Sequence, residues 1–356
     1  MEQMFKRTLV GAAVAAVAFS GSALAKPATE TVDLYGQIAI SIAQDAETDA
    51  AADKPIKMDN ESRIGVRGAA QFERGPKIIW QLEGGNVGDD GSDSGLGVRD
   101  TYGGFDFGDS GKLYFGRVLT PLFEVVDGYT GQSSGTGFTA GNSGNINYDR
   151  QSNMIRYDSA NLGGFSFDLG IGRGEEDIEG SNIYGAAAQF QQGVATFKVA
   201  YEHNNDRPIE TQTIGDEKQK VFGEANAFIA GVNLDFDTMG FHLAYLNGEV
   251  KAEENNENNG AGVNIDFRKK SQDAIKLGAY YVGIEHWTFN LNYAANSDVE
   301  KDGVDVIGNT TAITGQAMYS IDPAAVVYLR LVHKEDETAT GSETDLGWRV
   351  GMEYYF

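Results

Sequence analysis

The sequence predicts an all-β fold, a transmembrane antiparallel β-barrel of about sixteen strands with long external loops and short periplasmic turns. Three observations favour this fold. Segments with apolar residues at every second position recur along the chain, the connections between them alternate between long and short, and the N-terminus carries an export signal. Because lipid cannot satisfy backbone polar groups, strands in a bilayer must close into a ring with one face in hydrocarbon.

The first 25 residues have the composition of a cleaved signal peptide. Lys6 and Arg7 precede an apolar, Ala-rich stretch over residues 8–19, and Ala23–Ala25 (ALA) places small residues at a cleavage site. A membrane anchor is the alternative, but a spanning helix needs about 20 apolar residues. Residues 26–356 are then expected to form a single barrel domain outside the cytoplasm.

The first and last segments of this domain show the alternation most clearly. In Val32–Ile42 (VDLYGQIAISI) the even positions are apolar apart from Gly36, over eleven residues. In 345–356 (DLGWRVGMEYYF) the apolar and aromatic residues from Leu346 to Phe356 again fall on one face. This length matches the roughly 9–11 residues of a tilted membrane strand and exceeds the usual soluble strand. A half-buried sheet of a secreted β-protein is the alternative interpretation.

The remaining predicted strands follow the same pattern. They lie near residues 62–72, 77–86, 97–107, 112–118, 152–158, 165–173, 183–191, 194–203, 225–236, 240–250, 273–283, 287–295, 312–320 and 324–333. None of these segments contains a proline, which could not donate a hydrogen bond within a central strand.

The connections alternate in length along the chain. Residues 44–61, 119–151, 204–224 and 251–272 are long and hydrophilic. The connections at 73–76, 108–111, 192–193, 237–239 and 322–323 are tight. In outer-membrane barrels the short turns face the periplasm and the long loops face outward, whereas a soluble sandwich has no reason to sort its loops in this way.

The composition excludes several functions. The chain has 52 acidic and 28 basic residues, a net charge of −24, and no cysteine. An acidic balance disfavours nucleic acid, which requires clustered Lys and Arg, and no thiolate metal site or disulfide can form. The four histidines fall in no catalytic or metal-ligating motif. No enzyme activity, cofactor or metal is therefore predicted.

Several segments resemble the general porins of Gram-negative outer membranes, which are sixteen-stranded and trimeric. Val32–Gly36 (VDLYG) resembles their first strand and Ser62–Gly68 (SRIGVRG) their second. Leu113–Arg117 (LYFGR) is similar to the strand before their constriction loop, and Ile155–Ser159 (IRYDS) to the strand after it. The C-terminal Phe356 resembles the signal read by the barrel-assembly machinery.

The resemblance implies that the third external loop, here residues 119–151, folds into the lumen and narrows the pore. This loop carries Glu124 and Asp127 as candidate pore acids. The resemblance also implies an opposing basic wall, for which the candidates are Arg63, Arg67, Arg99, Arg117 and Arg150. Arg63 and Arg67 share one strand face, which must be lumenal because an arginine at the lipid midplane costs about 2–4 kcal/mol. Acid facing base would create a transverse field that orients polar solutes.

The predicted function is an outer-membrane channel for passive diffusion of small hydrophilic solutes and ions. The net charge predicts a weak cation preference. One alternative is a channel specific for a sugar, peptide or anion, although the inward aromatics, such as Tyr35 and Tyr355, form no evident ladder for sugars. A surface or adhesion barrel is another. The resemblance further implies a homotrimer in contact with outer-membrane lipid and lipopolysaccharide.

Overall fold

The computed structural model describes residues 27–29, 32–49, 52–85, 95–130, 137–144, 146, 148–214, 216–253, 258–259 and 262–356. The signal peptide predicted over residues 1–25 lies outside these ranges and stays a prediction. The strands are β1 (Pro27–Thr29), β2 (Val32–Gln44), β3 (Lys57–Asn60), β4 (Arg63–Gln71), β5 (Lys77–Gly84), β6 (Leu96–Asp106), β7 (Lys112–Leu119), β8 (Arg150–Asp158), β9 (Phe165–Arg173), β10 (Asn182–Gln192), β11 (Ala195–Ile214), β12 (Glu217–Asp235), β13 (Met239–Ala252), β14 (Lys269–Tyr281), β15 (Trp287–Asn296), β16 (Val299–Lys301), β17 (Val304–Val306), β18 (Thr310–Asp322), β19 (Ala325–Thr338) and β20 (Gly341–Tyr355). The helical segments are η1 (Gly108–Ser110), α2 (Pro121–Thr130) and η2 (Gly141–Ser143).

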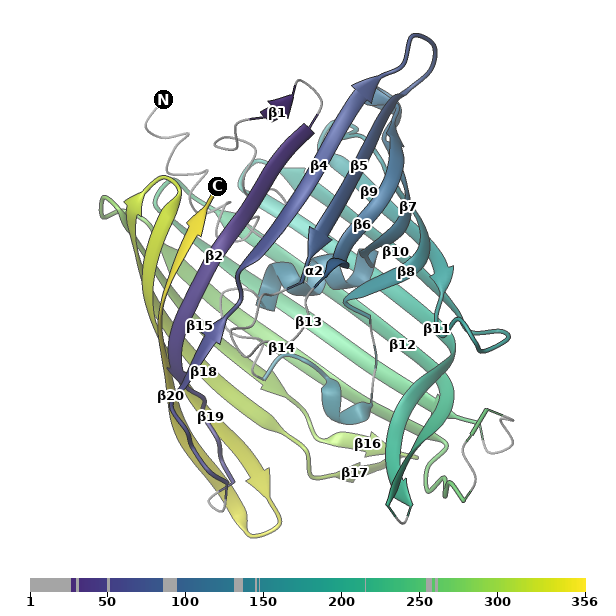
Figure 1. The fold of residues 1–356 in the computed structure, drawn as a ribbon. Helices are drawn as coiled ribbons and strands as arrows, with labels where there is room; N and C mark the ends of the chain where they lie inside the picture. The colour runs from purple at the N-terminus through teal and green to yellow at the C-terminus, as the bar shows by residue number, and fades with distance from the viewer. Residues whose placement is uncertain are drawn as a thin grey trace.

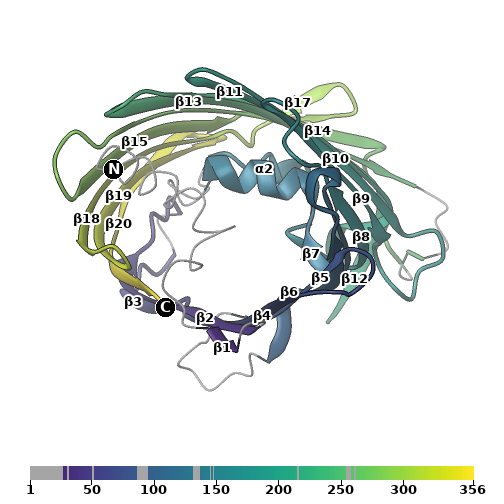
Figure 2. The ribbon, with the colours of Figure 1, turned by 90° about the horizontal axis from the view of Figure 1, so that it is seen from above.

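Sixteen of the strands form a closed antiparallel barrel, as the sequence predicts (Figures 1 and 2). Each pairs with its neighbour along the chain, and the ring closes where β2 pairs with β20 in the register Gln37 to Tyr355. Just beyond this register, Gly36 and Phe356 exchange two backbone hydrogen bonds, of 2.9 and 3.1 Å. The short strands β1, β3, β16 and β17 extend this sheet without contributing to its closure.

The side chains alternate between the two faces of the barrel wall. On β13, Phe241, Leu243 and Tyr245 are exposed on the outside, whereas Ala244 and Leu246 are buried on the inside. Since hydrocarbon would surround the outer face, an exposed apolar band carries no hydrophobic penalty there. No helix in the described ranges has the length and apolarity required to cross a membrane.

One external connection differs from the prediction. The sequence predicts a loop over residues 204–224, but β11 continues to Ile214 and β12 starts at Glu217, so the two strands run on as a hairpin. Pro208 is tolerated within it because the register shifts directly after this residue. Ile209 and Val221 are buried in the hairpin's inner side, which supplies the packing that holds the strands together.

The connection between β7 and β8 folds into the lumen, as predicted. Helix α2 lies inside the ring, close to β10 and β11 and between the two rims of the barrel (Figures 1 and 2). The hydroxyl of Thr120 accepts a hydrogen bond of 3.2 Å from the backbone N–H of Phe123 and so caps the helix. One face of the helix, formed by Leu122, Val125, Val126 and Tyr129, is buried against the wall.

Candidate functional site

A cavity of about 490 Å³ lies between α2 and the inner faces of β2, β4 to β8 and β20. Its basic lining residues are Arg63, Arg67, Lys77, Lys112 and Arg156. Its acidic lining residues are Asp33, Glu83, Asp100, Glu124 and Asp158. Four tyrosines, Tyr35, Tyr102, Tyr114 and Tyr355, line the same space. A barrel of this strand number leaves an aqueous channel, and this cavity is the part of it beside the inward-folded loop.

The arginines of β4 lie on the lumenal wall. Arg63 and Arg67 both face the cavity, whereas Ile64 between them is exposed on the outside. The Arg67 guanidinium carbon lies 4.8 Å from the centroid of the Tyr35 ring, and its Nε lies 3.8 Å from a carboxylate oxygen of Asp33. The hydroxyl end of the Tyr35 ring lies against Gly65, where a Cβ would come within 2.4 Å of it. Glycine at position 65 therefore allows the tyrosine to support Arg67.

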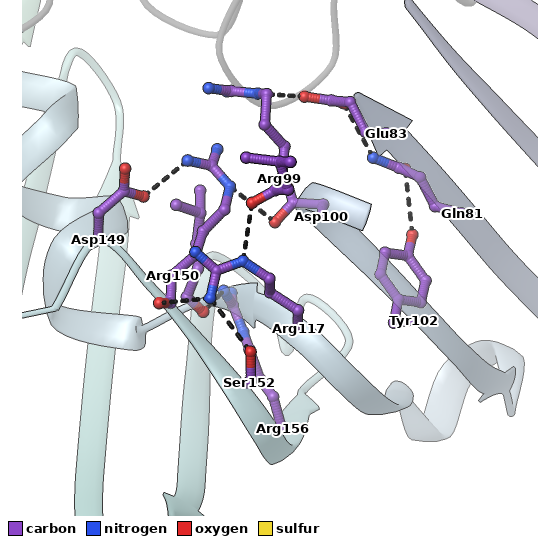
Figure 3. A network of polar contacts seen from close by, with 12 residues as sticks. Gln81, Glu83, Arg99, Asp100, Tyr102, Arg117, Asp149, Arg150, Ser152 and Arg156 are labelled. Atoms are coloured by element: carbon purple, nitrogen blue, oxygen red, sulfur yellow. Dashed lines mark hydrogen bonds and ion pairs between the residues drawn. The ribbon is translucent and has the colours of Figure 1, made fainter. Parts of the chain in front are cut away.

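Arg99 and Arg150 join this wall through carboxylates (Figure 3). Arg99 bonds Glu83, which also accepts a hydrogen bond of 2.7 Å from the Tyr35 hydroxyl. Arg150 is buried and bonds Asp100 at 3.1 Å and Asp149 at 2.7 Å. The pairing of β5 with β6 is irregular between Leu82 and Gly84. Arg99 and Asp100 are consecutive in the sequence, yet this irregularity allows both side chains to bond partners on the lumenal side.

Arg117 does not join this group. It lies on the same side of β7 as Leu113 and Phe115, whereas the cavity is lined by Lys112, Tyr114 and Val118. Its guanidinium donates to the carbonyl of Val98 at 2.8 Å and to the hydroxyl of Ser152 at 3.2 Å (Figure 3). The structure thus places Arg117 on the outward face, next to the irregularity that follows Gly116.

The acids of α2 have different surroundings. Glu124 bonds Arg156, a buried residue of β8 that also bonds Asp158 at 2.6 Å and the Leu119 carbonyl at 3.0 Å. Arg156 therefore ties the N-terminal turn of α2 to the wall. Sequence analysis did not select Arg156 as a site residue, although it shares a face with Asp158 by simple alternation.

Asp127 lies one turn further along α2 and is half-buried. Burial, and next the negative charge of Asp149, raise the pKa of the Asp127 carboxyl, while Arg150, Arg99 and Arg63 act in the opposite direction. The three arginines come from β8, β6 and β4. Asp127 and these arginines therefore affect one another electrostatically, although Asp127 itself does not line the cavity.

Comparison with known proteins gives the family. The family model described as Gram-negative porin matches residues 12–339. The chain is 35% identical to a protein named chitoporin from Vibrio furnissii, with both chains covered completely. It is 31% identical to outer membrane porin protein 32 from Delftia acidovorans, over 78% of this chain and 75% of the relative. The chain belongs to the Gram-negative porin family.

The solved structures agree with this porin fold. An anion-selective porin from Comamonas acidovorans superposes with a TM-score of 0.71 at 19% identity, covering 91% of this chain and 99% of the other. OmpT from Vibrio cholerae gives a TM-score of 0.70 at 16% identity, covering 93% and 100%. The family and fold are those of outer-membrane channels rather than enzymes.

Two further lumenal bases of this porin were missed by sequence analysis. Lys77 and Lys112 begin the strands β5 and β7 and line the cavity at its periplasmic side. Both lysines follow a tight turn directly. The alternating pattern identifies such positions as the ends of strands and gives no sign that their side chains line the lumen. Within the described ranges, no group of three or more His, Asp or Glu side chains has the arrangement of a metal site.

Proposed function

We propose that this porin forms a water-filled pore for passive diffusion of small hydrophilic solutes, with residues 119–151 as its constriction and a throat that favours anions. The single observation that carries the charge preference is the pairing of the cavity's charges. Each of its five acids bonds or closely approaches an arginine. Among the residues that the structure describes, Arg63, Lys77 and Lys112 have no such ion pair. A solute in the throat therefore meets uncompensated positive charge.

This proposal differs from the weak cation preference that the net charge of −24 predicts. Many of the excess acids, such as Asp45, Glu47, Glu253 and Asp266, lie in the external connections rather than in the throat. Charges in water are screened beyond a Debye length of about 8 Å at physiological ionic strength. The charges that line the narrow part act at shorter range and therefore control selectivity more strongly than the sum over the chain.

Liposome swelling tests the diffusion function. Liposomes that contain the purified porin should swell in isosmotic sugars, at rates that fall smoothly as the sugar grows larger and show no saturation. Empty liposomes and liposomes with heat-denatured protein are the controls. Saturation by one sugar at low concentration, or no swelling at all, would contradict general diffusion.

A channel specific for chitin-derived sugars is the second candidate. It is favoured by the four tyrosines of the cavity, Tyr35, Tyr102, Tyr114 and Tyr355, and by the name of the relative from Vibrio furnissii. Aromatic rings can stack on sugar rings, but Arg67 already covers the Tyr35 ring and Tyr102 meets Tyr114 edge-on. Block of the single-channel current by micromolar chitohexaose, and not by maltohexaose, would establish this candidate in place of general diffusion.

We also propose a homotrimer embedded in outer-membrane lipid and lipopolysaccharide and delivered by the barrel-assembly machinery. The family relationship supports the trimer, and the exposed apolar band supports the lipid contact. The terminal Phe356, which lies at the closure between β2 and β20, supports recognition of the C-terminal strand. Migration of unheated protein at three times the monomer mass, lost on heating, is the expected result on a gel.

A further inference from the structure

The wall behind α2 is built from small residues. The buried face of the helix, with Val125, Val126 and Tyr129, packs on Ala187 of β10 and Ala200 of β11. Tyr129 lies against Gly231 of β12, where a Cβ would come within 2.4 Å of its hydroxyl. These residues let the helix lie close to the wall. Because burial of apolar surface is non-directional, a directional contact adds to this packing in fixing the position of the helix.

One such contact lies at the C-terminal end of the helix. Lys276 projects from β14 into the lumen, is fully buried, and donates a hydrogen bond from Nζ to the backbone carbonyl of Tyr129. The last carbonyls of a helix have no partner within it and carry the negative end of its dipole. The amino group of Lys276 therefore satisfies this carbonyl, at the end of the helix where a donor is favoured.

The two ends of α2 are held by different strands. At the N-terminal end, Arg156 of β8 bonds Glu124, and Thr120 caps the first turn. At the C-terminal end, the Tyr129 ring meets His242 of β13 edge-on at 5.9 Å, beside the Lys276 contact. The loss of one contact should therefore release one end of the helix and leave the other in place.

We propose that Lys276 is a positioning residue of the pore: it pins the C-terminal turn of α2 to the wall and thereby sets the open cross-section of the throat. This inference rests on the proposed role of residues 119–151 as the constriction. Without the pin, the last turn leaves the wall part of the time and swings into the solute path, while Arg156 keeps the first turn docked. The open cross-section of the throat then fluctuates instead of keeping one value.

Thiol labelling tests the docking of the helix directly. The chain has no cysteine, so Val126→Cys reports on the C-terminal half of the docked face and Leu122→Cys on its N-terminal half. Loss of a hydrogen bond to a charged group raises the undocked population roughly tenfold or more. Adding Lys276→Met should therefore raise the labelling rate of the thiol at position 126 by about that factor and leave the rate at position 122 unchanged. Equal rates at position 126 with and without Lys276 would overturn the inference.

Three variants control this test. Lys269→Met removes a lysine of the same strand that pairs with Glu249 outside the lumen, and should leave both labelling rates unchanged. Lys276→Arg retains a cationic donor and should keep the thiol at position 126 protected. Lys276→Gln keeps a donor without the charge, and replaces Lys276→Met if heat-modifiable migration shows that the Lys276→Met barrel does not fold.

Planar-bilayer recording links docking to the pore. The Lys276→Met channel should show open-channel current noise several-fold above wild type, with brief partial closures that are absent in Lys269→Met. Increased labelling with unchanged noise would show that the helix moves without setting the pore, and would overturn the inference. A wild-type protein without any conductance would instead overturn the proposed function, because labelling does not depend on ion flow.

Discussion

At the scale of single residues, Asp127 shows how the throat changes the chemistry of a side chain. Its carboxyl is half-buried on α2 and its pKa is raised, first by burial and then by the charge of Asp149. An ordinary aspartate, with a pKa near 4, keeps its charge down to mild acid, whereas Asp127 should lose its charge at a higher pH. Protonation removes a negative charge that faces Arg63, Arg99 and Arg150, and so strengthens their effect on passing ions.

The upward shift of the Asp127 pKa predicts how ion selectivity depends on pH. The ratio of anion to cation permeability should rise as the pH is lowered, because the raised pKa of Asp127 makes this carboxyl neutral at a higher pH than an ordinary aspartate. Asp127→Asn should have the higher ratio already at pH near 7 and a flatter pH dependence. Zero-current potentials in a salt gradient at several pH values measure both effects. An Asp127→Asn channel with the same pH dependence as wild type would show that other groups control the titration.

Arg63 and Arg117 show which side-chain directions could be predicted from the sequence. Strict alternation places Arg63 and Arg67 on one face, and the structure places both on the lumenal cavity. The same counting places Arg117 with Leu113 and Phe115 on the outward face, as the structure does, whereas the family resemblance implied a place in the basic wall.

At the scale of elements, the small residues behind α2 decide how much of the lumen the helix occupies. Gly231→Ala would force Tyr129 away from the wall, since the added methyl group would overlap its ring and hydroxyl. We expect a smaller single-channel conductance and a loss of about 1–3 kcal/mol in the free energy of unfolding from overpacking. Gly315→Ala, at a position where a Cβ meets no atom within 4 Å, should leave both unchanged. Equal conductance in both variants would argue against the close fit of the helix.

The hairpin formed by β11 and β12 shows what the sequence could not predict about elements. Strand alternation located sixteen strands, and the tight turns located the periplasmic side. Residues 204–224, however, contain Asn, Asp and Pro, which are typical of loops. Their strands are stabilised by burial of Ile209, Val221 and Phe222 and by Arg207 over the Tyr148 ring at 3.8 Å. These contacts come from distant segments and leave no local pattern.

At the scale of the whole molecule, closure of the ring depends on the C-terminus. Phe356 exchanges two backbone hydrogen bonds with Gly36, and its ring lies on that glycine, where a Cβ would come within 2.4 Å of it. Phe356→Ala should lower the free energy of unfolding by about 1–3 kcal/mol, because the half-buried ring is lost while the backbone pairing remains. Urea unfolding of detergent-folded barrels, followed by gel migration, measures this change. An unchanged midpoint would show that the ring does not contribute to closure.

The net charge of the whole molecule and the unpaired charges of its throat predict opposite ion preferences. The chain carries a net charge of −24. Within the described part of the chain, however, each acid of the cavity pairs with an arginine, and no ion pair is formed by Arg63, Lys77 or Lys112. We therefore propose that selectivity follows from which charges of the cavity are paired rather than from the composition of the chain. The pairing depends on the inward fold of residues 119–151 and on strand register.

The zero-current potential of the purified porin in a KCl gradient tests this account most directly. We predict that the potential has the sign of an anion-preferring channel, and that Lys77→Gln combined with Lys112→Gln moves it toward zero with little change in conductance. Replacement of two external lysines, Lys251 and Lys269, by Gln is the matched control and should leave the potential unchanged. A wild-type potential of the cation-preferring sign would contradict the account, since the net charge would then outweigh the unpaired bases of the throat.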